Sequence, residues 1–326
     1  MMRAVVVRNE NGAFSSGIED IPPAEGTGTT IGVAYSSLNY KDALTLTNRS
    51  PIVRAWPMIA GIDGAGSVID GGGGSLQAGA PAVVTGWGLG ERRWGCFAER
   101  VSVEPDWPTP LPAGLTPREA MAFGTAGLTA MLCVMAIERH GVRPPDGPVL
   151  VTGAAGGVGG MVLILLKKLG YETTASTGRT TEADYLSDLG ATSVIDRAEL
   201  SSPGKPLMKE RWSAVVDSLG SVTLANACAS TRYGGVVAAC GLAQGMDFPS
   251  SVAPFILRGV TLAGIDSVMA RPSLRAAAWS RIAELIDREA IGRMVREIEM
   301  AELFDAAQEL LAGKVRGRLV VRIGSS

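Results

Sequence analysis

Residues 149–160 of the chain read Val-Leu-Val-Thr-Gly-Ala-Ala-Gly-Gly-Val-Gly-Gly. The first four residues predict a buried strand, and the apolar run from Met161 to Leu169 predicts a helix after the glycines. A strand, a glycine-rich turn and a helix in this order are typical of a dinucleotide-binding site. Glycines let the backbone approach a pyrophosphate closely, and the N–H groups at the helix start face the anion. We therefore favour nucleotide binding over a turn that only packs.

The next strand, Glu172 to Thr177, ends in Thr177-Gly178-Arg179. A fold that selects NAD usually has Asp or Glu about 20 residues after the glycines, where the acid binds the ribose 2′-hydroxyl. An acid would repel a 2′-phosphate, whereas hydroxyl, backbone N–H and guanidinium groups would bind it. The sequence therefore predicts NADPH as the cofactor in preference to NADH. The alternative is that Arg179 is a solvated loop residue.

Length and composition predict a soluble globular protein of two domains. The chain has 326 residues, of which 46% are hydrophobic and 19% charged. A net charge of −2 gives no electrostatic reason to expect nucleic acid or an anionic membrane as a partner. The N-terminus lacks the apolar core of a signal peptide, and we expect no apolar run long enough to span a bilayer. The expected location is the cytoplasm.

Cysteine and histidine usage limits the possible chemistry. Cys96, Cys133, Cys228 and Cys240 are scattered, which argues against a zinc knuckle or a disulfide framework. Cys133 and Cys240 lie in apolar runs and are expected to be buried thiols. The single histidine, His140, precedes a glycine at an expected helix end and is interpreted as a terminal cap. Histidine metal sites and a Ser-His-Asp hydrolase are disfavoured, so the chemistry is expected to come from a cofactor.

The strand pattern changes along the chain. Up to about residue 123, short strands with Gly and Pro between them predict a partly open β-barrel, at 3–7, 31–36, 66–69, 82–85 and 97–103. From Thr125, strands alternate with helices, which predicts a doubly wound parallel sheet. Its strands are expected at 149–152, 172–177, 193–195, 214–217, 235–239 and 260–265. Helices at 273–288 and 303–311 and a strand at 317–323 are assigned back to the first domain.

Several segments resemble a known family. They are residues 36–43 (Ser-Ser-Leu-Asn-Tyr-Lys-Asp-Ala), 61–66, 86–91 (Gly-Trp-Gly-Leu-Gly-Glu), 124–131, 240–243, 254–258 and 266–269. Together with the glycine turn they resemble the zinc-free, quinone-oxidoreductase-like medium-chain dehydrogenases/reductases, and among these the bacterial NADPH-dependent acryloyl-CoA reductases. The resemblance implies an α/β protein with a GroES-like, partly open β-barrel catalytic domain at 1–124 and 267–326, and a Rossmann NADPH-binding domain at 125–266.

The resemblance also indicates whether the protein has a zinc site. Zinc-dependent members of this superfamily have a cysteine ligand near position 39 and Gly-His-Glu at 61–63. This chain has Asn39 and Gly61-Ile62-Asp63 there, so both ligand positions are lost and no metal is expected. Without zinc to polarise an alcohol, reduction of an activated carbon–carbon double bond is favoured.

By resemblance, the cofactor contacts fall on Tyr40, Thr129, Ala155, Gly156, Gly157, Val158, Thr177, Gly178, Arg179, Arg197, Leu242, Ile256 and Ser267. The reaction implied is hydride transfer from NADPH to the β-carbon of acryloyl-CoA. Tyr40 is the expected hydrogen-bond or proton donor, with Asn39 beside it, although Tyr40 could equally pack on the cofactor amide.

Other charged residues have weaker expected roles. Arg92, Arg93 and Arg318 are candidates for contacts with CoA phosphates. The adjacent opposite charges of Lys41 and Asp42 are interpreted as an orienting pair.

Two rival functions stay open: a quinone or 2-alkenal reductase of the same superfamily, and an NADPH-binding protein with little turnover. The expected partners are a small-molecule acyl-CoA and a second copy of the chain, as a homodimer or dimer of dimers, with no nucleic acid and no membrane.

Overall fold

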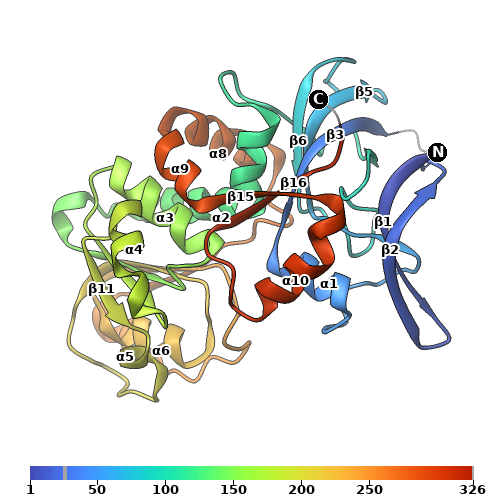
Figure 1. Ribbon diagram of the computed structural model, residues 1–326. Coiled ribbons are helices and arrows are strands. Elements are labelled where there is room, and N and C mark those ends of the chain that lie inside the picture. Colours follow the sequence, from blue (N-terminus) through green and yellow to red (C-terminus); the bar gives the residue numbers. More distant parts are fainter. Residues whose placement is uncertain (25–27, 325–326) are drawn as a thin grey trace. The chain divides into compact units, whose positions relative to one another are not determined.

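The computed structural model describes residues 1–24 and 28–324, and the chain divides into two compact units (Figure 1). Unit 1 comprises Met1–Leu128, Ser267–Glu284 and Met294–Ser326, and unit 2 comprises Thr129–Asp266 and Leu285–Arg293. The first boundary therefore lies after Leu128 instead of Gly124, because one helix runs through this region. Residues 285–293, expected in the first domain, belong to unit 2.

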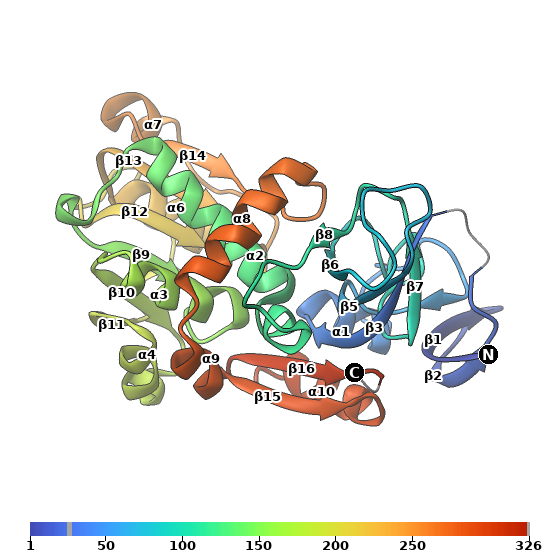
Figure 2. The same cartoon turned by 90° about the horizontal axis from the view of Figure 1, so that it is seen from above.

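Unit 2 is built on a six-stranded parallel sheet in the order β11-β10-β9-β12-β13-β14 (Figure 2). In chain order this is 3-2-1-4-5-6, the strand order of a Rossmann fold, so the predicted doubly wound sheet is confirmed. The strands are β9 (Val149–Thr152), β10 (Thr173–Thr177), β11 (Ser193–Asp196), β12 (Trp212–Asp217), β13 (Thr231–Ala239) and β14 (Thr261–Gly264).

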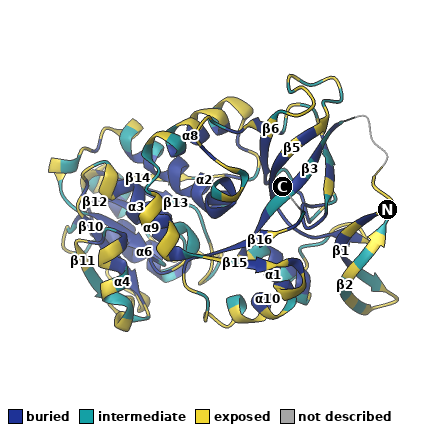
Figure 3. Ribbon diagram, turned by 45° about the horizontal axis from the view of Figure 1, so that its top comes forward, coloured by how far each residue is buried: buried dark blue, intermediate teal, exposed yellow. Residues whose placement is uncertain are grey.

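The central strands of this sheet are covered by helices. β9 and β12 are buried throughout, as their continuous apolar sequences predict for a parallel sheet packed on both faces (Figure 3). The helices of unit 2 are α3 (Gly157–Lys168), α4 (Ala183–Leu189), α5 (Ala198–Ser201), α6 (Ser221–Ser230), α7 (Ala253–Arg258) and most of α9 (Arg288–Met294), with short 3₁₀ turns at Pro144–Asp146 and Thr180–Glu182.

Unit 1 contains two sheets whose strands pair mostly antiparallel. A three-stranded sheet has the order β2-β1-β4, and a seven-stranded sheet has the order β15-β16-β3-β5-β6-β8, with β7 paired to β3. The strands are β1 (Met2–Glu10), β2 (Ala13–Ile21), β3 (Thr29–Leu38), β4 (Met58–Ile59), β5 (Asp63–Asp70), β6 (Pro81–Thr85), β7 (Arg100–Val103), β8 (Thr109–Pro110), β15 (Val295–Glu299) and β16 (Arg318–Arg322). The helices are α1 (Tyr40–Thr47), α8 (Pro272–Leu285) and α10 (Leu303–Leu311), with a 3₁₀ turn at Met300–Glu302.

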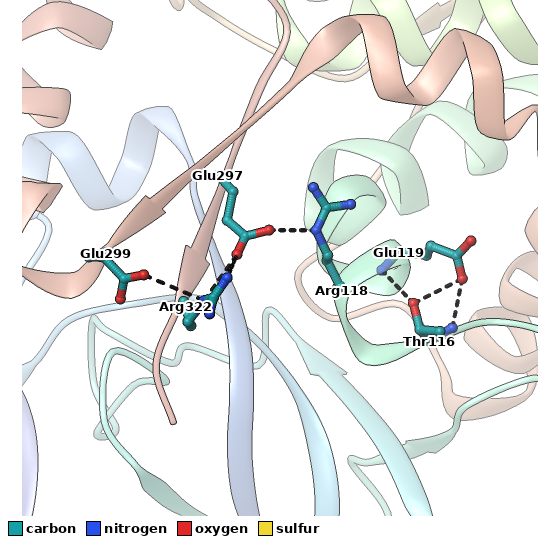
Figure 4. Close-up of polar contacts among 6 residues, drawn as sticks. All are labelled: Thr116, Arg118, Glu119, Glu297, Glu299 and Arg322. Atoms are coloured by element: carbon teal, nitrogen blue, oxygen red, sulfur yellow. Dashed lines mark hydrogen bonds and ion pairs between the residues drawn. The ribbon is translucent and has the colours of Figure 1, made fainter. Parts of the chain in front are cut away.

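Helix α2 (Pro117–His140) is kinked at Gly124, whose φ is 52° and ψ is −152°. Its N-terminus has a capping box, in which the Glu119 carboxylate accepts from Thr116 and the Glu119 N–H donates to the Thr116 hydroxyl (Figure 4). By length and hydropathy α2 could span a membrane, so the expectation that no run is long enough is wrong. However, 83% of its most apolar window is buried inside the protein, as in a core helix. His140 ends α2, and its Nε2 lies 2.8 Å from the Gly234 carbonyl.

A charge network joins α2 to β15 and β16 within unit 1 (Figure 4). Nε of Arg118 lies 2.5 Å from one Glu297 oxygen, and Arg322 donates to the other oxygen. Arg322 also lies 3.4 Å from Glu299. The guanidinium of Arg118 and then that of Arg322 lower the pKa of Glu297.

Candidate active site

In unit 2, the turn after β9 is tight and packs closely on helix α3. Gly153 has a φ of +61°, and a Cβ there would lie 2.5 Å from the Ser218 hydroxyl. A Cβ on Gly159 would lie 2.5 Å from the Gly153 carbonyl oxygen, so the first turn of α3 packs directly on the turn backbone. Gly156 is the N-cap of α3, and its own N–H donates to the Gly153 carbonyl. The glycines at 153 and 159 are therefore required for bending and close packing.

The N-terminus of α3 is open to an anion. Gly156 is exposed and Gly157 and Val158 are partly exposed, while Ala155 is buried. The cap residue, Gly156, has no side chain to cover this end of the helix, and residues 157–160 carry no acid. The backbone N–H groups and the positive end of the helix dipole are thus available to a phosphate.

The expected 2′-phosphate residues lie together at the end of β10. The Thr177 hydroxyl accepts from the Arg179 N–H at 3.1 Å, and the Thr177 carbonyl accepts from the Arg197 N–H at 2.9 Å. The Arg197 guanidinium lies against Gly178, where a Cβ would approach Nε to 2.6 Å. Arg179 forms a 3.4 Å ion pair with Glu182. The Arg197 guanidinium, the Thr177 hydroxyl and the exposed backbone of Gly178 therefore lie at this strand end, and Arg179 follows as the partner of Glu182. Guanidinium, hydroxyl and backbone N–H groups are donors that suit a phosphate.

Asp217 was not identified from the sequence. Its carboxylate binds the end of β9, next to the glycine turn. Its Oδ1 accepts from the Thr152 hydroxyl at 2.7 Å, and its Oδ2 accepts from the N–H groups of Leu219 and Gly220. The Thr152 hydroxyl in turn accepts from the Ser218 N–H at 3.1 Å. Burial raises the pKa of Asp217. The only sequence signal was a carboxylate at the end of a buried strand.

The remaining expected cofactor residues are spread more widely. Thr129 is buried in α2, and Leu242 and Ile256 are exposed in unit 2. Ser267 is buried and is the first residue of unit 1 after the long unit 2 segment.

Unit 1 contains a buried polar cluster around Asn39, Asp63 and Arg318. Arg318 donates from Nη1 to Oδ1 of Asn39 at 2.9 Å and from Nη2 to the Ser37 hydroxyl at 2.8 Å. Nδ2 of Asn39 lies 2.8 Å from Oδ2 of Asp63. Both oxygens of Asp63 also accept from Thr125, through its N–H at 2.8 Å and its hydroxyl at 2.5 Å. The cluster thus ties together β3, β5, β16, the start of α1 and the kink in α2.

The kink at Gly124 is part of this cluster. A Cβ at Gly124 would lie 2.5 Å from Oδ2 of Asp63 and 2.8 Å from Nη2 of Arg318. At the kink, the N–H of Thr125 donates to the Asp63 carboxylate. Glycine is needed here for both its positive φ and its lack of a side chain.

Asp42 is the second buried carboxylate of unit 1. Its oxygens accept from the N–H groups of Asn39 at 2.9 Å and Ile62 at 3.0 Å, and it forms a capping box with Asn39. Burial, and then the nearby charge of Asp63, raise the pKa of Asp42 to about 7. Lys41 instead pairs with Glu91 at 2.5 Å, so the expected Lys41–Asp42 pair is wrong: α1 turns the two side chains toward different partners.

The residues at the lost zinc positions do not fit a metal. The oxygens of Asn39 and Asp63 already accept hydrogen bonds from Arg318, Asn39 Nδ2 and Thr125. The positive guanidinium of Arg318, buried in the same cluster, would repel a cation. Across residues 1–24 and 28–324, no group of three or more His, Cys, Asp and Glu side chains is arranged to hold a metal ion.

The other expected catalytic and substrate residues differ in exposure. Tyr40, the first residue of α1, is 51% exposed. Arg92 and Arg93 are exposed and pair with Glu91 and Glu104 respectively. Arg318 is only 4% exposed, and its guanidinium is bonded inside the protein. The expectation that Arg318 meets CoA phosphates does not fit this burial, because each of its three guanidinium nitrogens donates inside the protein.

Comparison with known proteins gives the family. A family model described as "Zinc-binding dehydrogenase" matches residues 157–286, a range that excludes the lost ligand positions. An Escherichia coli protein named "Probable acrylyl-CoA reductase AcuI" is 43% identical over 99% of this chain and 100% of its own length.

Two further matches cover nearly the whole chain. The structure of the yhdH oxidoreductase from Salmonella enterica in complex with NADP is 44% identical, with a TM-score of 0.95 over 99% of this chain and 100% of that one. The Bacillus subtilis protein named "Putative quinone oxidoreductase YhfP" is 42% identical over 94% of this chain and 92% of its own length. Its structure with NAD bound has a TM-score of 0.94, covering 98% of this chain and 99% of that one. The chain therefore belongs to the quinone-oxidoreductase-like branch of the medium-chain dehydrogenases/reductases, together with proteins named acrylyl-CoA reductases.

Proposed function

We propose that this protein reduces the carbon–carbon double bond of acryloyl-CoA with NADPH and without zinc. The balanced reaction is acryloyl-CoA + NADPH + H⁺ → propionyl-CoA + NADP⁺. The observation that carries the proposal is the closed Asn39–Asp63–Arg318 network at the position of the zinc ligands in metal-dependent relatives. It replaces a Lewis acid by a fixed hydrogen-bond network, which favours reduction of an activated alkene over alcohol oxidation. The named relatives and the phosphate-binding donor set at Thr177 and Arg197 support the same reading.

Tyr40 is the residue of unit 1 best suited to act on the substrate. NADPH, when bound, supplies the hydride that reaches the β-carbon. The alkene electron pair then moves to the thioester, and negative charge develops on its oxygen. An exposed phenol can donate a hydrogen bond to this oxygen or pass a proton to the α-carbon. The alternative, in which Tyr40 packs on the cofactor amide, predicts a change in binding instead of rate.

Asn39 has a positioning role in this proposal. Its amide nitrogen faces the carboxylates of Asp42 and Asp63, and its amide oxygen accepts from Arg318. Because its side chain is fully used inside the protein, it acts by fixing the first turn of α1, where Tyr40 begins the helix. Arg92 and Arg93, both exposed, remain the candidate contacts to CoA phosphates.

The proposal is tested by comparing NADPH oxidation with acryloyl-CoA, short enoyl-CoA thioesters, free enals and quinones. Turnover should be highest with acryloyl-CoA. Good turnover of quinones alone would support the second candidate, which the name of the Bacillus subtilis relative favours. NADPH binding without turnover of any of these compounds would support a binding protein.

The absence of a catalytic metal is a separate part of the proposal. Activity should survive exhaustive chelation, and elemental analysis should find no stoichiometric zinc. Loss of activity on chelation, with recovery on adding zinc, would overturn it.

We also propose that the protein is a homodimer or a dimer of dimers in the cytoplasm. β14 is one of the two edge strands of the unit 2 sheet, and the exposed apolar side chains of Val252, Leu257 and Leu262 lie on or near it in sequence. An edge strand with apolar neighbours is suited to pair with a second copy across a two-fold axis. The four free cysteines suit a reducing compartment. Light scattering that finds only a 33.8 kDa species would contradict the oligomer.

A further inference from the structure

Trp87 in the Gly-Trp-Gly segment is held in an unfavourable conformation. Its φ is +56°, between Gly86 at +74° and Gly88 at +76°. A bulky residue rarely adopts this left-handed region, and its indole Nε1 is buried without a hydrogen-bond acceptor in the described part of the chain. Such an arrangement persists only where neighbouring groups hold it firmly, and it often marks a functional constraint.

The Trp87 ring belongs to a group of four stacked side chains in unit 1. The Arg275 guanidinium carbon lies 4.4 Å from the centre of one face of Trp87. Trp107 is stacked on Trp87 with a centroid distance of 5.2 Å and an interplanar angle of 6°. Arg93 lies over the Trp107 ring at 4.9 Å. Cation–π contacts of this kind are strongest where the cation is removed from water, as Arg275 is at 1% exposure.

The buried guanidinium of Arg275 also binds the backbone. Nη2 donates to the carbonyls of Ser267 at 2.8 Å and Val268 at 2.7 Å, and Nε donates to the carbonyl of Ala270 at 2.9 Å. Nη1 donates to the carbonyl and the hydroxyl of Thr85, both at 2.8 Å. Because a buried charge must be satisfied, these bonds fix the backbone of residues 267–270 to the end of β6.

Trp87 binds the same segment. Its backbone N–H donates to the Val268 carbonyl at 3.0 Å, so this oxygen accepts from both Trp87 and Arg275. A Cβ on Gly86 would lie 2.9 Å from that carbonyl oxygen, which explains the glycine there. The turn at Trp87 and the buried arginine thus both bind the segment that begins with Ser267.

We infer that Arg275 and Trp87 are positioning residues for NADPH, acting through the backbone of Ser267 and Val268. The inference rests on the proposed function and on the cofactor contact that the family resemblance implies at Ser267. Arg275 and Trp87 do not contact the cofactor themselves. They fix the position of the Ser267 backbone, and therefore of its side chain, to which the cofactor binds. A rival reading makes Arg275 a core residue of unit 1 with no influence on NADPH.

The test uses the Arg275→Lys variant of the full-length protein. Lysine keeps the charge but has only three N–H donors on a single nitrogen, so it cannot make the five bonds that the three guanidinium nitrogens make. We expect the Kd for NADPH, titrated by fluorescence without any acyl substrate, to rise about 10- to 100-fold, as expected for losing one or two charge-assisted bonds. Hydrogen exchange should speed up at residues 267–270 and 85–88 and stay unchanged in the rest of unit 1. The matched control is Arg211→Lys, because Arg211 also stacks on a tryptophan, Trp212, at 4.4 Å, yet lies in unit 2.

The outcomes distinguish a positioning role of Arg275 from a role in the core of unit 1. An unchanged Kd for NADPH, or faster exchange throughout unit 1, would overturn the inference in favour of a core role. If Arg275→Lys does not fold, Trp87→Gly replaces it, because glycine favours the positive φ while removing the stack. Weaker NADPH binding by Trp87→Gly supports the inference, and unchanged binding overturns it. The binding titration contains no acyl substrate, so its result does not depend on turnover. If the protein does not reduce acryloyl-CoA, the proposed function is wrong, but the effect of the variants on NADPH binding can still be measured.

Discussion

Nη1 of Arg318, on the C-terminal strand β16, lies 2.9 Å from Oδ1 of Asn39, the N-cap of helix α1. These residues are 279 positions apart in the sequence. The same guanidinium donates to the Ser37 hydroxyl, and the amide nitrogen of Asn39 donates to the Asp63 carboxylate. A C-terminal strand therefore fixes the start of the helix that carries Tyr40. Burial lowers the pKa of Arg318, and the nearby charges of Asp63 and Asp42 oppose that shift.

Arg318→Met should destabilise the protein by about 3–5 kcal/mol, because it removes the buried positive charge from the cluster that contains Asp63 and Asp42. Urea unfolding at pH 7 measures the loss. The control is Arg296→Met, which removes only an exposed ion pair with Glu309 and should cost less than about 1 kcal/mol. Equal losses in the two variants would show that the buried network contributes no more than a surface pair.

Asp42→Asn should remove part of the pH dependence of stability. The pKa of Asp42 is about 7 in the folded protein and about 3.9 in an unfolded chain, so between these values the folded protein binds a proton that the unfolded chain has released. This group therefore stabilises the fold at low pH, and the contribution is lost as pH rises through about 7. Unfolding free energies measured from pH 4.5 to 8 should fall less steeply with pH in the variant. Asp20→Asn, at an exposed position of β2, should keep the wild-type slope.

The parts of the fold that sequence predicted are those determined locally. The observed β9 has the predicted bounds, and β10 to β14 differ from prediction at most at their ends, because the alternation of short strands with helical segments is a local pattern in the sequence. Strands β2 and β15 and helix α1 were missed. β2 is partly or fully exposed along its length and carries no apolar run, and α1 is only eight residues long. The predicted helix 273–288 corresponds to α8, which ends at Leu285, and α9 was not predicted.

The candidate site divides in the same way. The glycine turn and the Thr177-Gly178-Arg179 segment could be found in the sequence because each is one short stretch with a known geometric need. The Asp63–Arg318 cluster could not, because its members come from β3, β5, α2 and β16 and only the fold brings them together. Asn39 was expected to be near the chemistry, yet its neutral amide gave no sign that it links an arginine to a carboxylate.

Arg179→Ala and Arg197→Ala should each raise the KM for NADPH far more than the KM for NADH. Only NADPH carries the 2′-phosphate, and a lost charge-assisted bond corresponds to about 10- to 150-fold. Arg197 is included because its guanidinium lies against Gly178. Steady-state kinetics with both cofactors measure the effect. If each variant changes both KM values equally, these arginines do not bind the 2′-phosphate.

Glu297→Gln should weaken the network of Figure 4. Arg118 and Arg322 lower the pKa of Glu297, so its contribution is present above the unfolded value of about 4.3 and is lost as pH falls through the folded value. The arginines are half exposed, so we expect a loss of only about 1 kcal/mol at pH 7 and less in high salt. Thermal unfolding at pH 7 and pH 3 measures it. A loss of the same size at pH 3 would assign the effect to packing instead of charge.

Tyr40→Phe tests the chemistry. If the exposed phenol donates to the developing enolate or supplies the α-proton, kcat with acryloyl-CoA should fall about 10- to 1000-fold while NADPH binding changes little, because a proton donor contributes on that order. If Tyr40 only packs on the cofactor, the Kd for NADPH should rise and kcat at saturation should hold. Labelled NADPH adds an independent readout, since deuteride should appear at C3 of the propionyl product and the solvent proton at C2. Deuterium at C2 would refute hydride transfer to the β-carbon, whatever the effect of the Tyr40 variant.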